Sequence, residues 1–227
     1  ETLKEAANGH YDLGIVVDPD VDRLAFIDER GEFFGEEYTL VAVADYILER
    51  QKGAAVSNLS SSIALQDVCR KHGVDYYSSA VGEVNVVSKM KEVEAIIGGE
   101  GNGGVILPAL HYGRDALAGV AIFLSYLAST GQSVSQLRSS YKDYYMVKDK
   151  MSVAEIDLDK LVQKLKEKYG HQRQDDVDGL KIYFDEGWIH LRKSNTEPIV
   201  RIYSESESES EARKLVARIK KDIAELN

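Results

Sequence analysis

The chain has 227 residues, of which 44% are hydrophobic and 29% are charged, a composition typical of a globular protein with a sizeable core. Its formal net charge of −10 at pH 7 opposes non-specific binding to nucleic acid or to an anionic membrane, so neither is an expected partner. Its apolar run ALAGVAIFL is far shorter than the roughly 20 residues that a membrane-spanning helix needs. No secretory signal is visible and the single Cys69 fits a reducing compartment, so we expect a cytoplasmic protein.

Two short strands are predicted near the start of the chain, and the segment between them is acidic. Leu13–Val17 is a continuous apolar run rich in β-branched residues, and Leu24–Asp28 is predicted as a second strand. The connection between them, residues 18–23, is called the aspartate loop below. It carries aspartates at alternate positions followed by an arginine: Asp18, Asp20, Asp22 and Arg23.

The aspartate loop is interpreted as a site for a hard cation. Carboxylates this close together repel one another unless a cation lies among them, and oxygen-only ligation suits Mg²⁺. A solvated turn is the alternative. An EF-hand loop is disfavoured, because strands flank the segment and Arg23 stands where that loop needs glycine. A phosphatase-type nucleophile at Asp18 also remains open, although nothing later in the chain obviously completes such a site.

From residue 36 to residue 144, strand and helix patterns alternate, which predicts an α/β layer with parallel pairing. Between two of its strands lies GGEGNGG, residues 98–104, called the glycine loop below. Its glycines allow a ligand to approach the backbone closely, and Glu100 and Asn102 supply the hydrogen-bonding side chains. A carboxylate that accepts from two adjacent hydroxyls is suited to a sugar, whereas the spacing does not fit a dinucleotide-binding loop. A mobile glycine loop is the alternative.

After residue 144 the pattern changes. Consecutive strands with tight turns, flanked by amphipathic helices, predict a smaller α+β domain with an antiparallel sheet over residues 145–227. The segment RKSNTEPIVR, residues 192–201, joins two of these strands and is called the arginine loop below. A turn rich in polar residues before Pro198 is one interpretation, but the flanking arginines favour anion binding, most simply of a phosphate. The groups suited to that anion are Arg192, Ser194, Asn195, Thr196 and Arg201.

The three loops, in this order, resemble motifs of the α-D-phosphohexomutases. DPDVDR is similar to that family's metal loop D-G-D-G-D-R, GEGNGG to its sugar loop G-E-x-S-G-H, and RKSNTEP to its phosphate loop R-x-S-x-T-E-P. The segment AVGEVNVVSKMKE also resembles the stretch that precedes the family's sugar loop. The resemblance covers essentially the whole chain.

The resemblance implies a Mg²⁺-dependent isomerase. It would move a phosphoryl group between C6 and C1 of a hexose phosphate, through a phosphoserine and a hexose 1,6-bisphosphate. Asp18, Asp20 and Asp22 would hold Mg²⁺, with Arg23 beside the transferred phosphate. Glu100 and Asn102 would hold the ring hydroxyls, and the arginine loop would hold the other phosphate. In family terms, residues 1–35 are the tail of domain 2, residues 36–144 are domain 3 and residues 145–227 are domain 4.

The chain departs from the family pattern in two respects. No Ser-His-Asn occurs in it, so the phosphoserine loop is missing and the N-terminal half of the same enzyme is an implied partner. We therefore expect the chain to be inactive alone. In addition, Asn102 and Gly104 stand where many members have Ser and His, and His111 is a weak substitute for that His. The wording of the loops is closest to phosphoglucosamine mutases, which favours glucosamine 6-phosphate and glucosamine 1-phosphate. The alternative is a stand-alone sugar-phosphate-binding module without catalysis.

Overall fold

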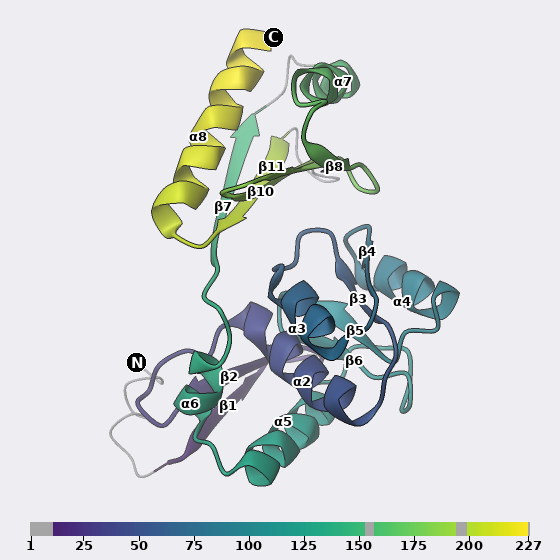
Figure 1. The fold of residues 1–227 in the computed structure, drawn as a ribbon, viewed down its shortest axis with the longest axis vertical. Helices are drawn as coiled ribbons and strands as arrows, with labels where there is room; N and C mark the ends of the chain where they lie inside the picture. Colours follow the sequence, from purple (N-terminus) through teal and green to yellow (C-terminus); the bar gives the residue numbers. More distant parts are fainter. Residues whose placement is uncertain (1–10, 153–156, 194–198, 227) are drawn as a thin grey trace. The chain divides into compact units, whose positions relative to one another are not determined.

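A computed structural model describes residues 11–152, 157–193 and 199–226. The chain divides into two compact units, with the boundary between Lys142 and Asp143 (Figure 1). No helix in the described part of the chain is both long enough and apolar enough to cross a membrane.

The N-terminal unit begins with a hairpin of β1 (Leu13–Val17) and β2 (Leu24–Asp28), paired antiparallel so that Val17 lies opposite Leu24. The register places the whole aspartate loop at the closed end of this hairpin. On β2, the ring of Phe26 stacks on Phe123 at 3.8 Å between ring centroids, and Phe34 packs edge-on against both rings. This buried aromatic cluster anchors the hairpin to the rest of the unit, because large apolar area and favourable ring geometry coincide there.

A four-stranded sheet forms the centre of the N-terminal unit, in the order β4-β3-β5-β6. Strand β3 pairs in parallel with β4 and β5, whereas β6 runs antiparallel to β5. The predicted α/β domain with a parallel or mixed sheet is confirmed. The strands are β3 (Ala55–Asn58), β4 (Tyr76–Ser79), β5 (Ile97–Glu100) and β6 (Gly104–Ile106). The helices are α2 (Glu36–Arg50), α3 (Ala64–His72), α4 (Glu83–Glu92), α5 (Ala116–Thr130) and α6 (Val134–Ser139).

The short β5–β6 connection follows from the sequence of the glycine loop. Gly103 has a φ of 85°, in the region where side chains are strained, and it lets the chain turn back at once. The carboxyl end of parallel strand β5 therefore opens directly into the glycine loop, which is where ligands of α/β sheets bind.

The C-terminal unit is a five-stranded antiparallel sheet in the order β7-β11-β10-β9-β8. It matches the smaller α+β domain with an antiparallel sheet that the sequence predicts. Its elements are β7 (Tyr145–Ser152), α7 (Leu158–Lys168), β8 (Arg173–Asp175), β9 (Leu180–Phe184), β10 (Gly187–Lys193), β11 (Ile199–Ser206) and α8 (Glu209–Leu226).

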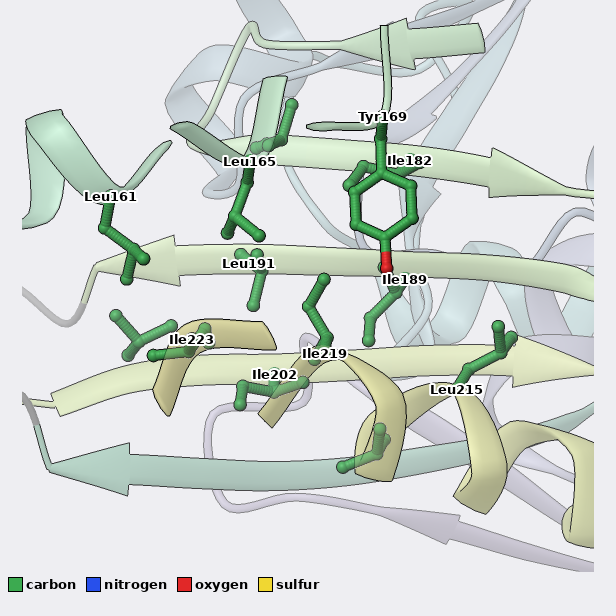
Figure 2. Close-up of a cluster of buried hydrophobic side chains, with 13 residues drawn as sticks. Leu161, Leu165, Tyr169, Ile182, Ile189, Leu191, Ile202, Leu215, Ile219 and Ile223 are labelled. Atoms are coloured by element: carbon green, nitrogen blue, oxygen red, sulfur yellow. The ribbon is translucent and has the colours of Figure 1, made fainter. Parts of the chain in front are cut away.

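The two faces of this sheet differ in character because side chains alternate along each strand. One face supplies the apolar core, which packs against α7 and α8 (Figure 2). Figure 2 shows sheet and helix residues of this core together: Ile182, Ile189, Leu191, Ile202, Leu215, Ile219 and Ile223. The opposite face is mostly polar and aromatic, and it carries both arginines of the arginine loop.

Residues 11–35 belong to the same compact unit as the parallel sheet. The assignment of residues 1–35 to a preceding family domain, and of 36–144 and 145–227 to the next two, stays a prediction.

Candidate functional site

The aspartate loop is closed by Asp18 itself. Its Oδ1 accepts hydrogen bonds from the backbone N–H groups of Asp22 and Arg23, both at 3.2 Å, and its Oδ2 accepts one from Arg23 Nε at 2.9 Å. Desolvation raises the pKa of Asp18, but these hydrogen bonds outweigh it, so the pKa lies below the ordinary value. Asp18 is thus held as a carboxylate, and both of its oxygens already accept hydrogen bonds.

Asp22 contacts a second arginine in addition to Arg23, whose Nε lies 3.6 Å from Oδ1 of Asp22. Its Oδ2 lies 2.5 Å from Arg114 Nη2, whereas its Oδ1 is buried and accepts no hydrogen bond from any residue that the structure describes. A buried carboxylate oxygen without a hydrogen bond is uncommon and costly, so a cationic ligand is the natural partner for it. Asp20 is exposed at the tip of the loop.

The three aspartates do not converge on one point. Within the residues that the structure describes, no group of three His, Cys, Asp or Glu side chains is arranged to hold a metal ion. The donor set still fits Mg²⁺ chemically, because it consists of carboxylate oxygens and includes the orphaned Oδ1 of Asp22.

Val21 adopts an unusual backbone conformation in this loop. Its φ is 55°, a left-handed value that β-branched residues rarely adopt. The carbonyl of Val21 accepts a hydrogen bond from the N–H of Ala116 at 3.2 Å, which ties the loop to the start of α5. A valine therefore stands here in a backbone conformation that favours glycine.

The residue that follows the aspartate loop is hydrogen-bonded to the glycine loop through the backbone. The N–H of Leu24 donates to the carbonyl of Gly103 at 3.1 Å. A Cβ on Gly103 would lie 2.2 Å from the carbonyl oxygen of Leu24, so only glycine permits this approach. Two motifs that are far apart in the sequence thus lie side by side.

Glu100 is the best-held side chain of the glycine loop. It is 5% exposed, and its Oε1 accepts hydrogen bonds from Asn58 Nδ2 at 2.9 Å and from the N–H of Gly82 at 3.2 Å. Its Oε2 accepts one from Arg114 Nη1 at 2.9 Å. Because a carboxylate offers about four acceptor directions, Glu100 has room for about one sugar hydroxyl unless a partner leaves.

Asn102 has a local role in the same loop. Its Oδ1 accepts a hydrogen bond from the N–H of Gly104 at 3.2 Å, which leaves its amide NH₂ as the group that can donate to a ligand. His111 instead lies 3.0 Å from Asp115, the N-cap residue of α5, and so has the character of a loop residue near a helix start.

Arg114 was missed by sequence reasoning, although it contacts both loops. Its guanidinium lies 2.5 Å from Asp22, 2.9 Å from Glu100 and 3.3 Å from Glu83. It stands outside all three motifs, and an arginine before a helix carries no signal by itself. Only the fold reveals it.

The arginine loop is described only at its ends. Ser194, Asn195 and Thr196 lie outside the described residues. Arg192 and Arg201 are directly opposite each other on β10 and β11, and Arg201 is opposite Lys150 on β7. Like charges in register across a sheet repel one another, so this row of three cations favours a bound anion.

The surroundings of this row are consistent with anion binding. Arg192 Nε lies 2.9 Å from Asp178 Oδ2, so a carboxylate already takes one side of its guanidinium. Lys148, Lys150, Arg201 and Tyr203 line a groove on the same face of the sheet. A phosphate could bind several of these groups at once, with arginine giving two parallel hydrogen bonds.

Comparison with family models matches both units. Residues 35–144 match "Phosphoglucomutase/phosphomannomutase, alpha/beta/alpha domain III", and residues 147–222 match "Phosphoglucomutase/phosphomannomutase, C-terminal domain". The chain belongs to the phosphoglucomutase/phosphomannomutase family. The resemblance inferred from the motifs is confirmed.

Individual members of the family agree with this assignment. A curated phosphoglucomutase/phosphomannomutase of Thermococcus kodakarensis is 40% identical over 89% of this chain, which covers 45% of that protein. The chain spans about half the length of the curated relatives it matches.

Solved structures share the fold. A phosphoglucomutase/phosphomannomutase family protein of Burkholderia thailandensis superposes with a TM-score of 0.82 at 24% identity, over 99% of this chain and 48% of that one. The N-acetylphosphoglucosamine mutase of Aspergillus fumigatus, solved with GlcNAc-6P and magnesium, has a TM-score of 0.68 at 16% identity, over 93% of this chain and 48% of that one.

Proposed function

We propose that this chain supplies the metal-binding, sugar-binding and phosphate-binding groups of a phosphohexomutase, an isomerase that moves a phosphoryl group between C6 and C1 of a hexose phosphate. The observation that carries the proposal is that the aspartate loop and the glycine loop lie together: the guanidinium of Arg114 contacts both Asp22 and Glu100, and Leu24, directly after the aspartate loop, donates its N–H to the carbonyl of Gly103. A solvated turn and a free glycine loop have no need of such a contact.

Each group has a role in this proposal. Asp18, Asp20 and Asp22 would hold Mg²⁺, which supplies charge neutralisation at the transferred phosphoryl group. Arg23 would bind that phosphoryl group once released from Asp18. Glu100 accepts from a ring hydroxyl and Asn102 donates to one. Arg192, Ser194, Asn195, Thr196 and Arg201 would hold the phosphate that is not transferred.

The rest of the reaction needs groups outside this chain. The family's phosphoserine belongs to a Ser-His-Asn loop, which this sequence lacks. We propose that the N-terminal half of the same enzyme supplies it, and that the substrates are a hexose phosphate and its 1,6-bisphosphate. Glucosamine 6-phosphate is the favoured substrate, on the wording of the loops and on the curated relative of Methanopyrus kandleri that is named a probable phosphoglucosamine mutase.

Calorimetric titration of the chain with hexose phosphates tests the proposal. We expect glucosamine 6-phosphate and glucose 1,6-bisphosphate to bind, and Glu100→Gln to weaken binding by about tenfold, because a charge-assisted hydrogen bond to the sugar is lost. Glu92→Gln is the matched control, since Glu92 is exposed on α4 and pairs only locally with Lys89. Equal weakening in both variants, or no binding of any hexose phosphate, would contradict the sugar-binding role.

A coupled mutase assay separates the mutase proposal from its alternatives. We expect no turnover by the chain alone and turnover once a phosphoserine-bearing N-terminal half is added. Hexose phosphate binding without turnover in that mixture would favour a stand-alone binding module. Hydrolysis of a phosphosugar by the chain alone, abolished in Asp18→Asn, would favour the phosphatase-type alternative.

A further inference from the structure

Arg114 occupies a position that the motifs do not explain. It is 18% exposed, and its guanidinium contacts carboxylates from three separate segments: Asp22 of the aspartate loop, Glu83 at the start of α4 and Glu100 of the glycine loop. Its own backbone N–H also donates to Glu83 Oε1 at 3.1 Å. Its Nη1 donates to Glu100 and its Nη2 pairs with Asp22, whereas its buried Nε, 3.3 Å from Glu83, makes no hydrogen bond to any described residue. One planar group thus lies among three segments, which a lysine could not do with the same geometry.

The way Arg114 holds Asp22 leaves one oxygen of that carboxylate for another partner. Arg114 contacts Oδ2, while the buried Oδ1 accepts no hydrogen bond from any described residue and lies 3.6 Å from Arg23 Nε. Carboxylates that ligate metals are commonly fixed by a hydrogen bond to their other oxygen. Asp22 fits this arrangement, because Arg114 holds its Oδ2 and leaves its Oδ1 for a metal ion.

Arg114 occupies space that is free only because residue 104 has no side chain. A Cβ on residue 104 would lie 2.5 Å from Cδ of Arg114 and 3.1 Å from Oδ1 of Asn102. Any side chain at position 104 therefore displaces the arginine. Gly104 stands where the family pattern often has histidine, so the glycine and the arginine form a matched pair in this chain.

We propose that Arg114 is a positioning residue that couples the aspartate loop to the glycine loop. It fixes Asp22 so that Oδ1 faces the Mg²⁺ of the proposed function, on which this inference rests, and it fixes Glu100 for the sugar. Metal affinity and sugar-phosphate affinity therefore depend on the same guanidinium.

Mn²⁺ binding to the full chain, followed by the electron paramagnetic resonance signal of free Mn²⁺, tests this role. Relative to wild type, we expect Arg114→Met to bind Mn²⁺ at least about tenfold more weakly, the range found for outer-shell partners of metal ligands. Arg114→Lys keeps the positive charge but not the planar guanidinium with its several donors, so its Mn²⁺ affinity should fall less. Gly104→Ala should also weaken binding, because it displaces the arginine without removing it. Calorimetry should show glucosamine 6-phosphate binding weakened in the same three variants.

The control is Arg30→Met, which removes the partner of Asp28 at the other end of the same hairpin. It should leave Mn²⁺ affinity within about twofold of wild type. Circular dichroism checks that each variant is folded. If Arg114→Met does not fold, the Mn²⁺ affinity of Gly104→Ala tests the role of Arg114 instead. Mn²⁺ affinity that is unchanged or tighter without Arg114, or a loss of metal affinity with sugar-phosphate affinity intact, overturns the inference.

Asp20→Asn distinguishes failure of this inference from failure of the proposed function. If Mn²⁺ binding depends on Asp20 but not on Arg114, only the positioning role is wrong. If Mn²⁺ binding does not depend on Asp20, the aspartate loop is not the metal site and both fall.

Discussion

Val21 is a β-branched residue in a left-handed backbone conformation that favours glycine. Its φ of 55° costs a non-glycine residue roughly 1–2 kcal/mol, and its side chain is 40% exposed, so little packing offsets that cost. We expect Val21→Gly to stabilise the chain by up to about 1 kcal/mol, since part of the gain is lost to the greater freedom of glycine in the unfolded chain. Urea unfolding followed by circular dichroism measures it.

Val17→Gly provides the control for Val21. Val17 is also 40% exposed, but it lies in extended backbone on β1. There glycine removes strand preference without relieving strain, so the same substitution should destabilise by roughly 0.5–1 kcal/mol. Destabilisation by both variants would contradict the strain at Val21.

His190 makes the stability of the C-terminal unit depend on pH. It is 1% exposed, and desolvation together with Lys181 and Arg192 lowers its pKa from 6.5 to about 4, against the opposing effect of the Asp178 carbonyl and carboxylate. Between these two values the unfolded chain binds a proton that the folded chain does not, so stability falls as the pH falls. We expect a loss of about 2 kcal/mol between about pH 7 and pH 5 from this group.

The single Trp188 lies on the same strand as His190 and reports the unfolding of this unit by fluorescence. Urea titrations at both pH values, for wild type and His190→Gln, isolate the contribution. Glutamine can still donate to the Asp178 carbonyl, as Nε2 of His190 does at 2.6 Å, but it cannot take up the proton. Equal pH dependence in the two proteins would show that His190 is not the cause.

At the scale of elements, Asp45 on α2 holds several helices of the N-terminal unit together. Its buried carboxylate accepts hydrogen bonds from Lys71 at 2.9 Å, Tyr126 at 2.8 Å and Tyr141 at 3.0 Å, and it lies 2.5 Å from Nε2 of His72. These partners come from α3, from α5 and from the segment after α6. Desolvation raises the pKa of Asp45, but these groups together lower it below the ordinary value.

We expect Asp45→Asn to destabilise the N-terminal unit by about 2 kcal/mol, because the amide NH₂ cannot accept the hydrogen bonds that a carboxylate oxygen accepts, which leaves a buried donor such as Tyr126 or Tyr141 unsatisfied. Glu49→Gln on the same helix is the control. Glu49 is exposed and pairs with its neighbour Arg50, so its loss should cost well under about 1 kcal/mol. Thermal unfolding followed by circular dichroism compares the two, and similar shifts would contradict the central role of Asp45.

Most elements could be predicted from the sequence because their cause is local. The apolar spacing of residues 36–50 and the alternation along β9, β10 and β11 each specify one structure without help from the rest of the chain. The same holds for the two hairpin strands around the aspartate loop, since a β-branched run precedes the acidic turn and a second apolar segment follows it.

The site was only partly predictable, because its contacts are not local. Glu100 could be singled out, being a lone carboxylate among glycines, but Asn58 and Arg114, which hold it, come from other segments. The contact of Asp22 with Arg114, in addition to its neighbour Arg23, was equally hidden. Spacing in the sequence shows which side chains share a loop, but it does not show which cationic group each side chain contacts.

At the scale of the whole molecule, a divalent cation can stabilise the chain in two ways: by screening its formal net charge of −10, or by binding at a specific site. Any divalent cation screens an acidic chain and so stabilises it somewhat at low ionic strength. A specific site instead adds stability that depends on the ratio of free metal to the dissociation constant, about 2.7 kcal/mol when that ratio is about 100. The two effects differ in their dependence on concentration and on particular residues.

We therefore expect Mg²⁺ to raise the unfolding temperature along a binding curve, beyond the effect of NaCl at equal ionic strength. Asp20→Asn should remove the specific part, because Asp20 is an exposed carboxylate whose main expected role is as a ligand. Glu92→Gln changes the net charge equally and should keep that part, since Glu92 lies on α4 and pairs with Lys89. Calorimetric scans with and without excess chelator measure the difference. If Glu92→Gln loses as much stabilisation as Asp20→Asn, the effect of Mg²⁺ is screening of the whole chain and the aspartate loop is not its site.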